Sequence, residues 1–232
     1  MRRSRYKSRY KFKKEFDINL WQPRTNIGRA VKEKQITDIS QILRQGTPIK
    51  EMEIVDALMP DLEEDILSVG MVQRMHKSGR RVKFRVVAVV GNKDGIVGVG
   101  HGSTKEITSA IRKAVDTAKL NVIEVARGCG SWECGCGRPH SVPFKASGKS
   151  GSVKVTVKPA PKGLGLAAAE VPRTILRMAG VKDAWTRSEG QTRATLNFAF
   201  ATLDALKQTA RVALREQFKV HVNIGKAGEA HG

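Results

Sequence analysis

The chain has 232 residues and carries 42 Lys and Arg against 22 Asp and Glu, which gives a formal net charge of +20 and a pI near 10.3. A charge this large predicts a polyanionic partner. The sequence has no apolar run of about 18 residues and no short apolar segment after its basic N terminus, so we expect a cytoplasmic protein that binds nucleic acid, not membrane.

The length exceeds the commonest domain size of roughly 100–150 residues, which predicts two small domains with extensions. The first extension, residues 1–20, is a basic aromatic tail in which Lys and Arg alternate with Tyr and Phe. Its cations suit phosphates and its rings suit exposed bases, which predicts contact with RNA. The same composition is typical of a solvated, disordered tail, and order on binding would reconcile the two interpretations.

Residues 21–60 are predicted to form a helical extension. Apolar residues recur at helical spacing around residues 36–43, where Thr37 is a candidate cap, and again around residues 54–58 before Pro60. A third, short helix is expected to open at Leu62 and to close at Gly70.

Residues 61–126 are predicted to form an RNA-binding domain, in which the period of apolar residues changes to two from Met71. Strands are expected from residue 71, over residues 82–90 and from residue 96, with a basic turn over Lys77–Arg81. Ser103–Glu106 matches a capping box, and the long helix after it should bury its alanines and turn Lys105, Arg112, Lys113 and Lys119 outward. The order helix, three antiparallel strands, helix resembles the double-stranded RNA-binding domain, which reads phosphate and ribose geometry.

Two glycine-rich stretches fall short of nucleotide-binding motifs. The dinucleotide fingerprint at Gly98-Val99-Gly100 would need a glycine where Ser103 lies, so these glycines are expected to mark a bulge or a close backbone approach. The phosphate-loop pattern that ends at Lys149-Ser150 would need a glycine where Pro143 lies. We therefore expect Lys149 on a flexible turn that meets an RNA phosphate.

Residues 127–146 form a Cys/Gly-rich linker that contains all three cysteines of the chain. Four residues separate Cys129 from Cys134, one separates Cys134 from Cys136, and three separate Cys136 from His140. Such crowded cysteines do not predict a disulfide framework, but sulfur and imidazole are the donors that tetrahedral zinc prefers. A structural zinc that stiffens the linker is therefore one interpretation.

The other interpretation is a glycine-rich linker that lies on RNA, with the cysteines as small residues, because the Cys134–Cys136 spacing is tight for tetrahedral ligands. Its RNA contacts would be Arg127, Trp132, Arg138 and Lys145. A zinc-dependent RNA-modifying enzyme is a weaker alternative, since the sequence lacks the deaminase pairing of His-x-Glu with Pro-Cys-x-x-Cys. No catalytic residues are predicted.

Residues 147–215 are predicted to form a second, C-terminal α+β domain, and residues 216–232 a polar tail. Alternation indicates a strand over residues 153–157, apolar spacing indicates a helix that stops at Gly180, and a further strand is expected over Val181–Arg187. The longest helical pattern covers Thr195–Leu214. The predicted fold class is thus α+β, a double-stranded-RNA-binding-like domain followed by a small α+β sandwich.

Several ordered segments resemble small-subunit ribosomal protein five in its archaeal form, over roughly residues 20–215. The segments are MVQRMHKSGRRVKFRVVAVVGN, VGVGHGSTKEITSAIRKA, SGKSGSVKVTVKPAPKGLGL, RMAGVKDAW and ATLDAL. The resemblance implies a structural protein that binds small-subunit ribosomal RNA, contacts ribosomal protein four, lies near the messenger RNA entry path and influences decoding accuracy. It implies no catalysis, no small-molecule substrate and no membrane; a duplex-RNA binder outside the ribosome is the competing class.

The resemblance also assigns residues. The basic turn of the family falls on residues 77–81, and a Gly-x-Pro-His-like element falls on Gly137–His140, which gives His140 a role apart from metal. This chain departs from the family in having Gly163-Leu164-Gly165 where Gly-Thr-Gly is usual, which removes a hydroxyl that could bind RNA. The second domain of the family tends to contact other subunit proteins, so Leu164 and Leu166 suit a protein interface as well as an RNA contact. The predicted RNA-binding residues are Lys77, Ser78, Gly79, Arg80, Arg81, Lys83, Arg85, Arg127, Trp132, Arg138, Lys149, Lys158 and Lys162, and the candidate zinc ligands are Cys129, Cys134, Cys136 and His140.

Overall fold

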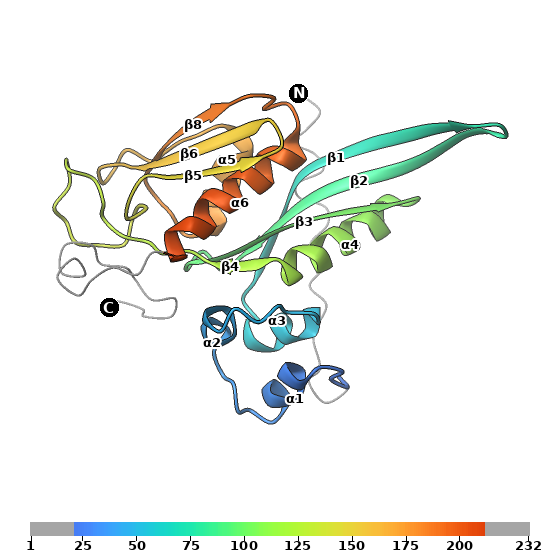
Figure 1. Ribbon diagram of the computed structural model, residues 1–232, viewed down its shortest axis with the longest axis horizontal. Helices are drawn as coiled ribbons and strands as arrows, with labels where there is room; N and C mark the ends of the chain where they lie inside the picture. The colour runs from blue at the N-terminus through green and yellow to red at the C-terminus, as the bar shows by residue number, and fades with distance from the viewer. Residues whose placement is uncertain (1–20, 212–232) are drawn as a thin grey trace. The chain divides into compact units, whose positions relative to one another are not determined.

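The computed structural model describes residues 21–211, so the predictions for the tails at residues 1–20 and 216–232 lie outside the described part. The chain divides into two compact units (Figure 1). The first unit comprises the described residues up to Val90 together with Gly100–Asn121. The second unit comprises Gly91–Val99 together with the described residues from Val122 onward. Among the described helices, none is long and apolar enough to cross a membrane.

Three short helices open the first unit: α1 over Asn26–Lys32, α2 over Ile39–Arg44 and α3 over Met52–Leu58. The side chain of Thr25 caps α1 by accepting a hydrogen bond from the Gly28 amide at 3.1 Å. The predicted helices around residues 36–43 and 54–58 are confirmed, although α2 begins after Asp38 and no side-chain cap comes from Thr37.

The following sheet has the strand order β1-β2-β3-β4. Its strands are β1 over Glu63–His76, β2 over Gly79–Gly91, β3 over Ile96–Thr104 and β4 over Val122–Glu124. β1 and β2 form a long hairpin whose tip extends past the neighbouring ends of β3 and α4 (Figure 1). The prediction of a short helix from Leu62 to Gly70 is wrong, because β1 begins at Glu63. The few apolar residues of this stretch fit the helical and the strand period equally poorly, and pairing with β2 selects the strand.

The helix α4 over Ile107–Leu120 buries the predicted alanine stripe. It lies so close to β3 that a Cβ on Gly100 would be 2.2 Å from the Ala118 nitrogen, which confirms the expected close backbone approach. The prediction of a capping box is wrong, because Ser103 belongs to β3 and Glu106 is the N-cap residue of α4, without a side-chain hydrogen bond to the helix start. Lys119 does not face outward either, because its ammonium lies 2.7 Å from a carboxylate oxygen of Asp56.

The second unit contains a sheet in the order β5-β6-β8-β7, parallel only between β7 and β8. Its elements are β5 over Ala146–Ser150, β6 over Val153–Pro159, β7 over Leu166–Ala167, α5 over Glu170–Met178, β8 over Ala184–Glu189 and α6 over Thr195–Arg211. The helix α6 packs along β5 and β6 and contacts α5, and the alternate valines of β6 are fully buried.

Two local predictions for this unit need correction. Lys149 lies in β5 and not on a flexible turn, because residues 146–150 pair antiparallel with β6. The strand expected from Val181 begins at Ala184, since Gly180 ends the helical segment with a φ of +80° and the chain then turns toward the sheet. The predicted α+β class is confirmed, with a four-stranded first sheet in place of a three-stranded one.

Candidate metal centre and nucleic-acid interface

The cysteine-rich linker is closed into a loop, which we call the Cys/His loop and define as residues 128–141. Gly128 and Ser141 exchange two backbone hydrogen bonds of 2.8 and 2.9 Å at its base. Next to this base, a Cβ on Gly130 would lie 2.0 Å from the Pro143 carbonyl oxygen, so only glycine allows the two strands of the loop to approach. The loop therefore carries its four candidate ligands within a short, fixed span.

The donor atoms of Cys129, Cys134, Cys136 and His140 all lie within 4.8 Å of one another. The Cys129 and Cys136 sulfurs are 3.6 Å apart, and the Cys134 sulfur is 3.7 Å from His140 Nε2. Zinc bonds of about 2.3 Å to sulfur and about 2.0 Å to nitrogen place neighbouring ligand atoms of a tetrahedron about 3.5–3.8 Å apart. The donor set and these two separations therefore fit a tetrahedral zinc ion.

A buried carboxylate orients the histidine. His140 Nδ1 lies 2.8 Å from Asp183 Oδ2, and both side chains are buried. The hydrogen bond of Nδ1 to the carboxylate fixes the orientation of the ring, so that Nε2 is the ring nitrogen that faces the cysteines. The other oxygen of Asp183 accepts hydrogen bonds from the amides of Gly163 at 3.1 Å and Gly165 at 2.7 Å, so one carboxylate joins the Cys/His loop to the loop before β7.

The thiols differ in acidity for local reasons. A hydrogen bond from the Lys162 amide, with others from Cys136, lowers the pKa of Cys134 to about 6. Burial and neighbouring thiols raise the pKa of Cys129 to about 11, and its S–H donates to the Cys134 carbonyl at 3.0 Å. Metal binding would therefore find one thiolate already formed and would displace a proton from another sulfur.

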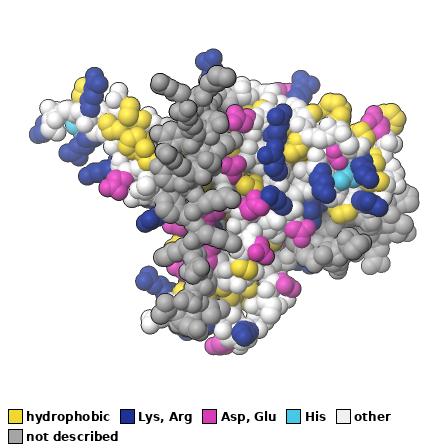
Figure 2. All heavy atoms as spheres, turned by 180° about the vertical axis from the view of Figure 1, so that it is seen from behind, with side chains coloured by type: hydrophobic (Ala, Val, Ile, Leu, Met, Phe, Trp, Pro, Cys, Tyr) yellow, Lys and Arg dark blue, Asp and Glu magenta, His cyan; other side chains and the backbone are white. Residues whose placement is uncertain are grey.

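The predicted RNA-binding residues of the first unit lie together on the hairpin. We call residues 77–81 the basic tip; all five are exposed, and Lys83 and Arg85 continue the exposed row along β2. Figure 2 shows dark-blue Lys and Arg side chains gathered at the end of this hairpin, at the upper left of the reversed view. Two exposed methionines, Met71 and Met75, lie on β1 beside them.

The remaining predicted contacts belong to the second unit and are dispersed. Arg138, Lys145, Lys149, Lys158 and Lys162 are exposed, and Trp132 is 93% exposed. Arg127 differs, because it is only 8% exposed and its guanidinium pairs with Asp94. It lines a cavity of about 470 Å³ whose other cations are Lys93, Arg177 and Lys182.

Sequence reasoning missed Asp183, the two glycine amides that bind it, and Trp185. Asp183 lies 43 residues beyond His140, and no local period or spacing links them. The only available signal was its place in the RMAGVKDAW segment. The basic surface on an α+β fold indicates the class: a nucleic-acid-binding protein.

Comparison with known proteins narrows that class. Residues 62–126 match the ribosomal protein S5 N-terminal domain, and residues 148–217 match the ribosomal protein S5 C-terminal domain. The chain is 59% identical over 202 residues to small ribosomal subunit protein uS5 of Methanothermobacter thermautotrophicus, covering 87% of this chain and 94% of that one. It is 57% identical over 209 residues to the uS5 protein of Methanocaldococcus jannaschii, covering 90% and 96%.

The chain belongs to the ribosomal protein S5 family. This family consists of structural, non-enzymatic ribosomal proteins, so the predicted family, the lack of catalysis and the cytoplasmic, ribosomal location are confirmed. The zinc-dependent RNA-modifying enzyme is thereby excluded as a function. The individual RNA contacts and the domain boundaries predicted from the sequence stay predictions.

Proposed function

We propose that this chain is a structural constituent of the small ribosomal subunit that binds its ribosomal RNA through the basic tip and stiffens its linker with one zinc ion. The observation that carries the RNA-binding part is the exposure of the whole basic tip on a hairpin of an S5-family protein. Three of its five residues, Lys77, Arg80 and Arg81, are cations. Cations held on a projecting strand pair can enter a groove and replace phosphate counterions.

Within the first unit, further RNA contacts are Lys83 and Arg85 on β2. The second unit contributes its own contacts through the exposed cations of the linker and strands. We propose ribosomal protein four as a neighbour, the messenger RNA entry path as the location, and decoding accuracy as the property influenced. Leu164 is 40% exposed beside the glycines that bind Asp183, and such an apolar residue suits contact with a neighbouring protein.

The zinc part of the proposal is supported by a complete protein ligand set. Three sulfurs and one imidazole fill the four positions of a tetrahedron, which leaves no position for a reacting water and makes the centre structural. The Asp183 carboxylate supplies the hydrogen bond that zinc-bound histidines ordinarily make to a neighbouring acceptor.

RNA binding is tested with the full chain and a transcript of small-subunit ribosomal RNA. We expect the affinity to fall steeply with salt, because Lys and Arg displace condensed cations. We expect Arg80→Ala and Arg81→Ala together to weaken binding at every salt concentration. Failure of the wild-type chain to bind the transcript at low salt would overturn the proposal, and equal binding by the double variant would remove the basic tip from it.

The zinc proposal is tested by metal analysis of reduced protein purified without chelator. We expect about one zinc per chain in the wild type and in Glu133→Gln, which changes an exposed residue of the same loop. We expect a large loss of zinc in Cys129→Ser and in Cys136→Ser. A metal-free wild-type chain that also fails to take up added zinc would contradict this part.

A further inference from the structure

The sheet of the second unit has one buried face and one exposed face. The register pairs Lys154 with Glu189 and Lys158 with Trp185, and these residues lie opposite the buried valines of β6. Lys149 pairs with Lys154 on the same exposed face. The helix α6 packs along β5 and β6 on the valine side and contacts α5. The opposite face of the sheet is exposed, and it carries lysines and an indole where a covered face would carry apolar residues.

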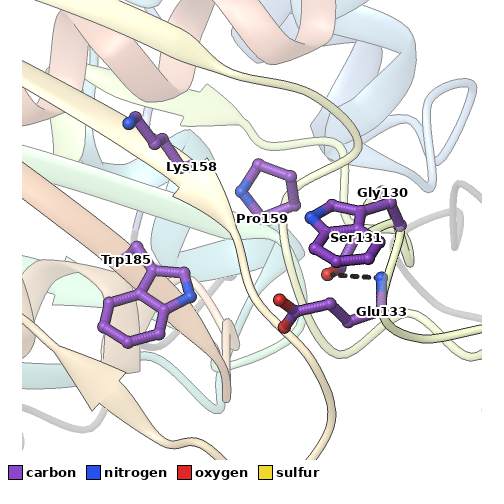
Figure 3. Close-up of a pocket in the computed structure, with 7 residues that line it drawn as sticks. Gly130, Ser131, Glu133, Lys158, Pro159 and Trp185 are labelled. Carbon is purple, nitrogen blue, oxygen red and sulfur yellow. Dashed lines mark hydrogen bonds between the residues drawn. The ribbon is translucent and has the colours of Figure 1, made fainter.

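A cleft of about 270 Å³ lies at one end of this face. Lys158, Pro159 and Trp185 contribute one side from the sheet, and Gly130, Ser131, Trp132 and Glu133 contribute the other from the Cys/His loop. Figure 3 shows Trp185 and Lys158 on one side of Pro159 and Glu133 on the other. Trp132 is 93% exposed and Trp185 is 46% exposed, so two large indole surfaces are presented to solvent at one cleft.

The loop side of the cleft is held by the architecture already described. Trp132 and Glu133 lie between Cys129 and Cys134, two of the candidate ligands, and the Glu133 amide donates to the Ser131 hydroxyl at 3.3 Å. Gly130, the first residue of this side, packs against the Pro143 carbonyl. Because the backbone of this loop is held on both sides of Trp132, little backbone entropy is lost when a partner stacks on the indole.

The chemistry of the cleft selects its occupant. The three lysines give the exposed face an excess of positive charge, because Glu189 is already 2.9 Å from the Arg187 guanidinium. Indole rings beside cations are the surface on which unpaired bases stack while their phosphates meet the lysines. Glu133 adds a carboxylate, which accepts hydrogen bonds from a base amino group or a ribose hydroxyl but repels a phosphate.

We propose that this cleft, lined by Trp132 and Trp185, binds an unpaired nucleotide of the small-subunit ribosomal RNA, with its base stacked on indole and its phosphates near Lys158. The inference rests on the proposed RNA-binding function and adds a single-stranded site to the groove-binding tip. Ribosomal RNA is the occupant chosen because the chain belongs to a family of small-subunit ribosomal proteins.

The first test measures tryptophan fluorescence of the zinc-loaded full chain. Trp21→Phe combined with Trp132→Phe leaves only Trp185, and Trp21→Phe combined with Trp185→Phe leaves only Trp132. We expect single-stranded oligonucleotides to quench both emissions, and a blunt RNA duplex to quench them much less. No quenching by single strands would overturn the inference.

The second test uses affinity and distinguishes the two proposals. Trp132→Ala with Trp185→Ala should weaken single-strand binding on the order of tenfold, and Leu164→Ala, an exposed apolar residue outside the cleft, should not. If the double variant binds single strands normally while Arg80→Ala with Arg81→Ala still weakens transcript binding, the cleft inference fails alone. If the wild type binds no RNA, both proposals fail.

The third test identifies the occupant in assembled subunits. A photoreactive phenylalanine in place of Trp132 should crosslink to ribosomal RNA at an unpaired nucleotide. Crosslinks to messenger RNA or to a neighbouring protein would overturn the assignment, because either would place a different partner over the cleft.

Discussion

The basic tip and the Cys/His loop are both glycine-containing connections with nearby cations, and the sequence predicts RNA contacts in both. Their surroundings differ. All five residues of the tip are exposed, whereas Cys129 and His140 in the loop are only 5% and 6% exposed. The tip presents its charge to solvent, while the loop packs against other groups of the chain, Asp183 and the Pro143 carbonyl.

The difference suggests a different source of order for each connection under the two proposals. A solvated cationic turn gains order from phosphates, and its contribution to folding is small. In the proposed zinc-bound form, a loop that buries a histidine against a carboxylate and collects three sulfurs would gain order from the metal, and metal binding would contribute to folding directly. Removing zinc should change the order of the loop alone, and substitutions in the tip should change RNA binding alone, so the two experiments distinguish these two sources of order.

Removing zinc should have the largest effect and should act on one region only. We expect a Glu-specific protease to cleave after Glu133 at least about tenfold faster in the metal-free chain, because each 1.4 kcal/mol of lost local stability multiplies the open fraction by about ten. Trypsin cleavage after Arg80 should not change. Equal acceleration at both sites would contradict the comparison, and mass spectrometry of the fragments measures it.

Asp183→Asn should weaken zinc binding about 10- to 100-fold, because the amide supports the histidine less well than the carboxylate does. Competition with a chelator of known affinity measures the change. Asp204→Asn is the matched control, since that carboxylate accepts a hydrogen bond from the Lys149 amide at 3.3 Å and does not belong to the candidate ligand set. Similar losses in both variants would argue against the role assigned to Asp183.

Gly130→Ala should weaken zinc binding about tenfold, because its Cβ would lie 2.0 Å from the Pro143 carbonyl oxygen and overpacking typically costs about 1–3 kcal/mol. Gly135→Ala, in the same loop, meets nothing within 4 Å and should bind zinc normally. The same chelator competition compares the two. An unchanged affinity in Gly130→Ala would mean that the loop base opens without disturbing the ligands.

Arg80→Ala with Arg81→Ala should lower the salt dependence of RNA binding without changing the fold. The slope of log affinity against log salt should fall by about 0.7–0.9 for each phosphate that the variant no longer neutralises. The free energy of unfolding should stay within about 0.5 kcal/mol of the wild type, because both side chains are exposed. Lys105→Ala, an exposed cation outside the tip, is the control; a destabilised double variant would show that the tip has internal partners after all.

Glu64→Gln should give the smallest effect, at the opposite end of β1 from the tip. Burial raises the pKa of Glu64 above its ordinary 4.5, against the opposing effect of the Lys119 ammonium 3.6 Å away. The stability contributed by the protonated carboxyl is complete below about 4.5 and is lost as pH rises through the raised pKa. Denaturation at several pH values should therefore show the wild type losing stability relative to the variant as pH rises.

Predictions from a regular spacing of apolar residues were the ones that the structure confirmed. The alternating valines of β6 and the alanine stripe of α4 were predicted correctly, because burial of one face imposes those spacings on the sequence. The segment from Leu62 to Gly70 was predicted as a helix, but β1 begins at Glu63, because the pairing partner β2 decides the conformation of a stretch with few apolar residues. Lys149 was similarly moved from a turn into β5 by pairing with β6.

By itself the sequence determined the basic charge, the α+β class, the family, and the identity of the four candidate ligands. Tertiary structure alone decided that the four donor atoms converge and that Asp183 orients His140. It also decided that Trp132 and Trp185 line one cleft. The physical reason is range: periodic burial and charge are written into neighbouring residues, whereas these contacts join segments that only the folded sheet and its loops bring within hydrogen-bonding or ligand distance.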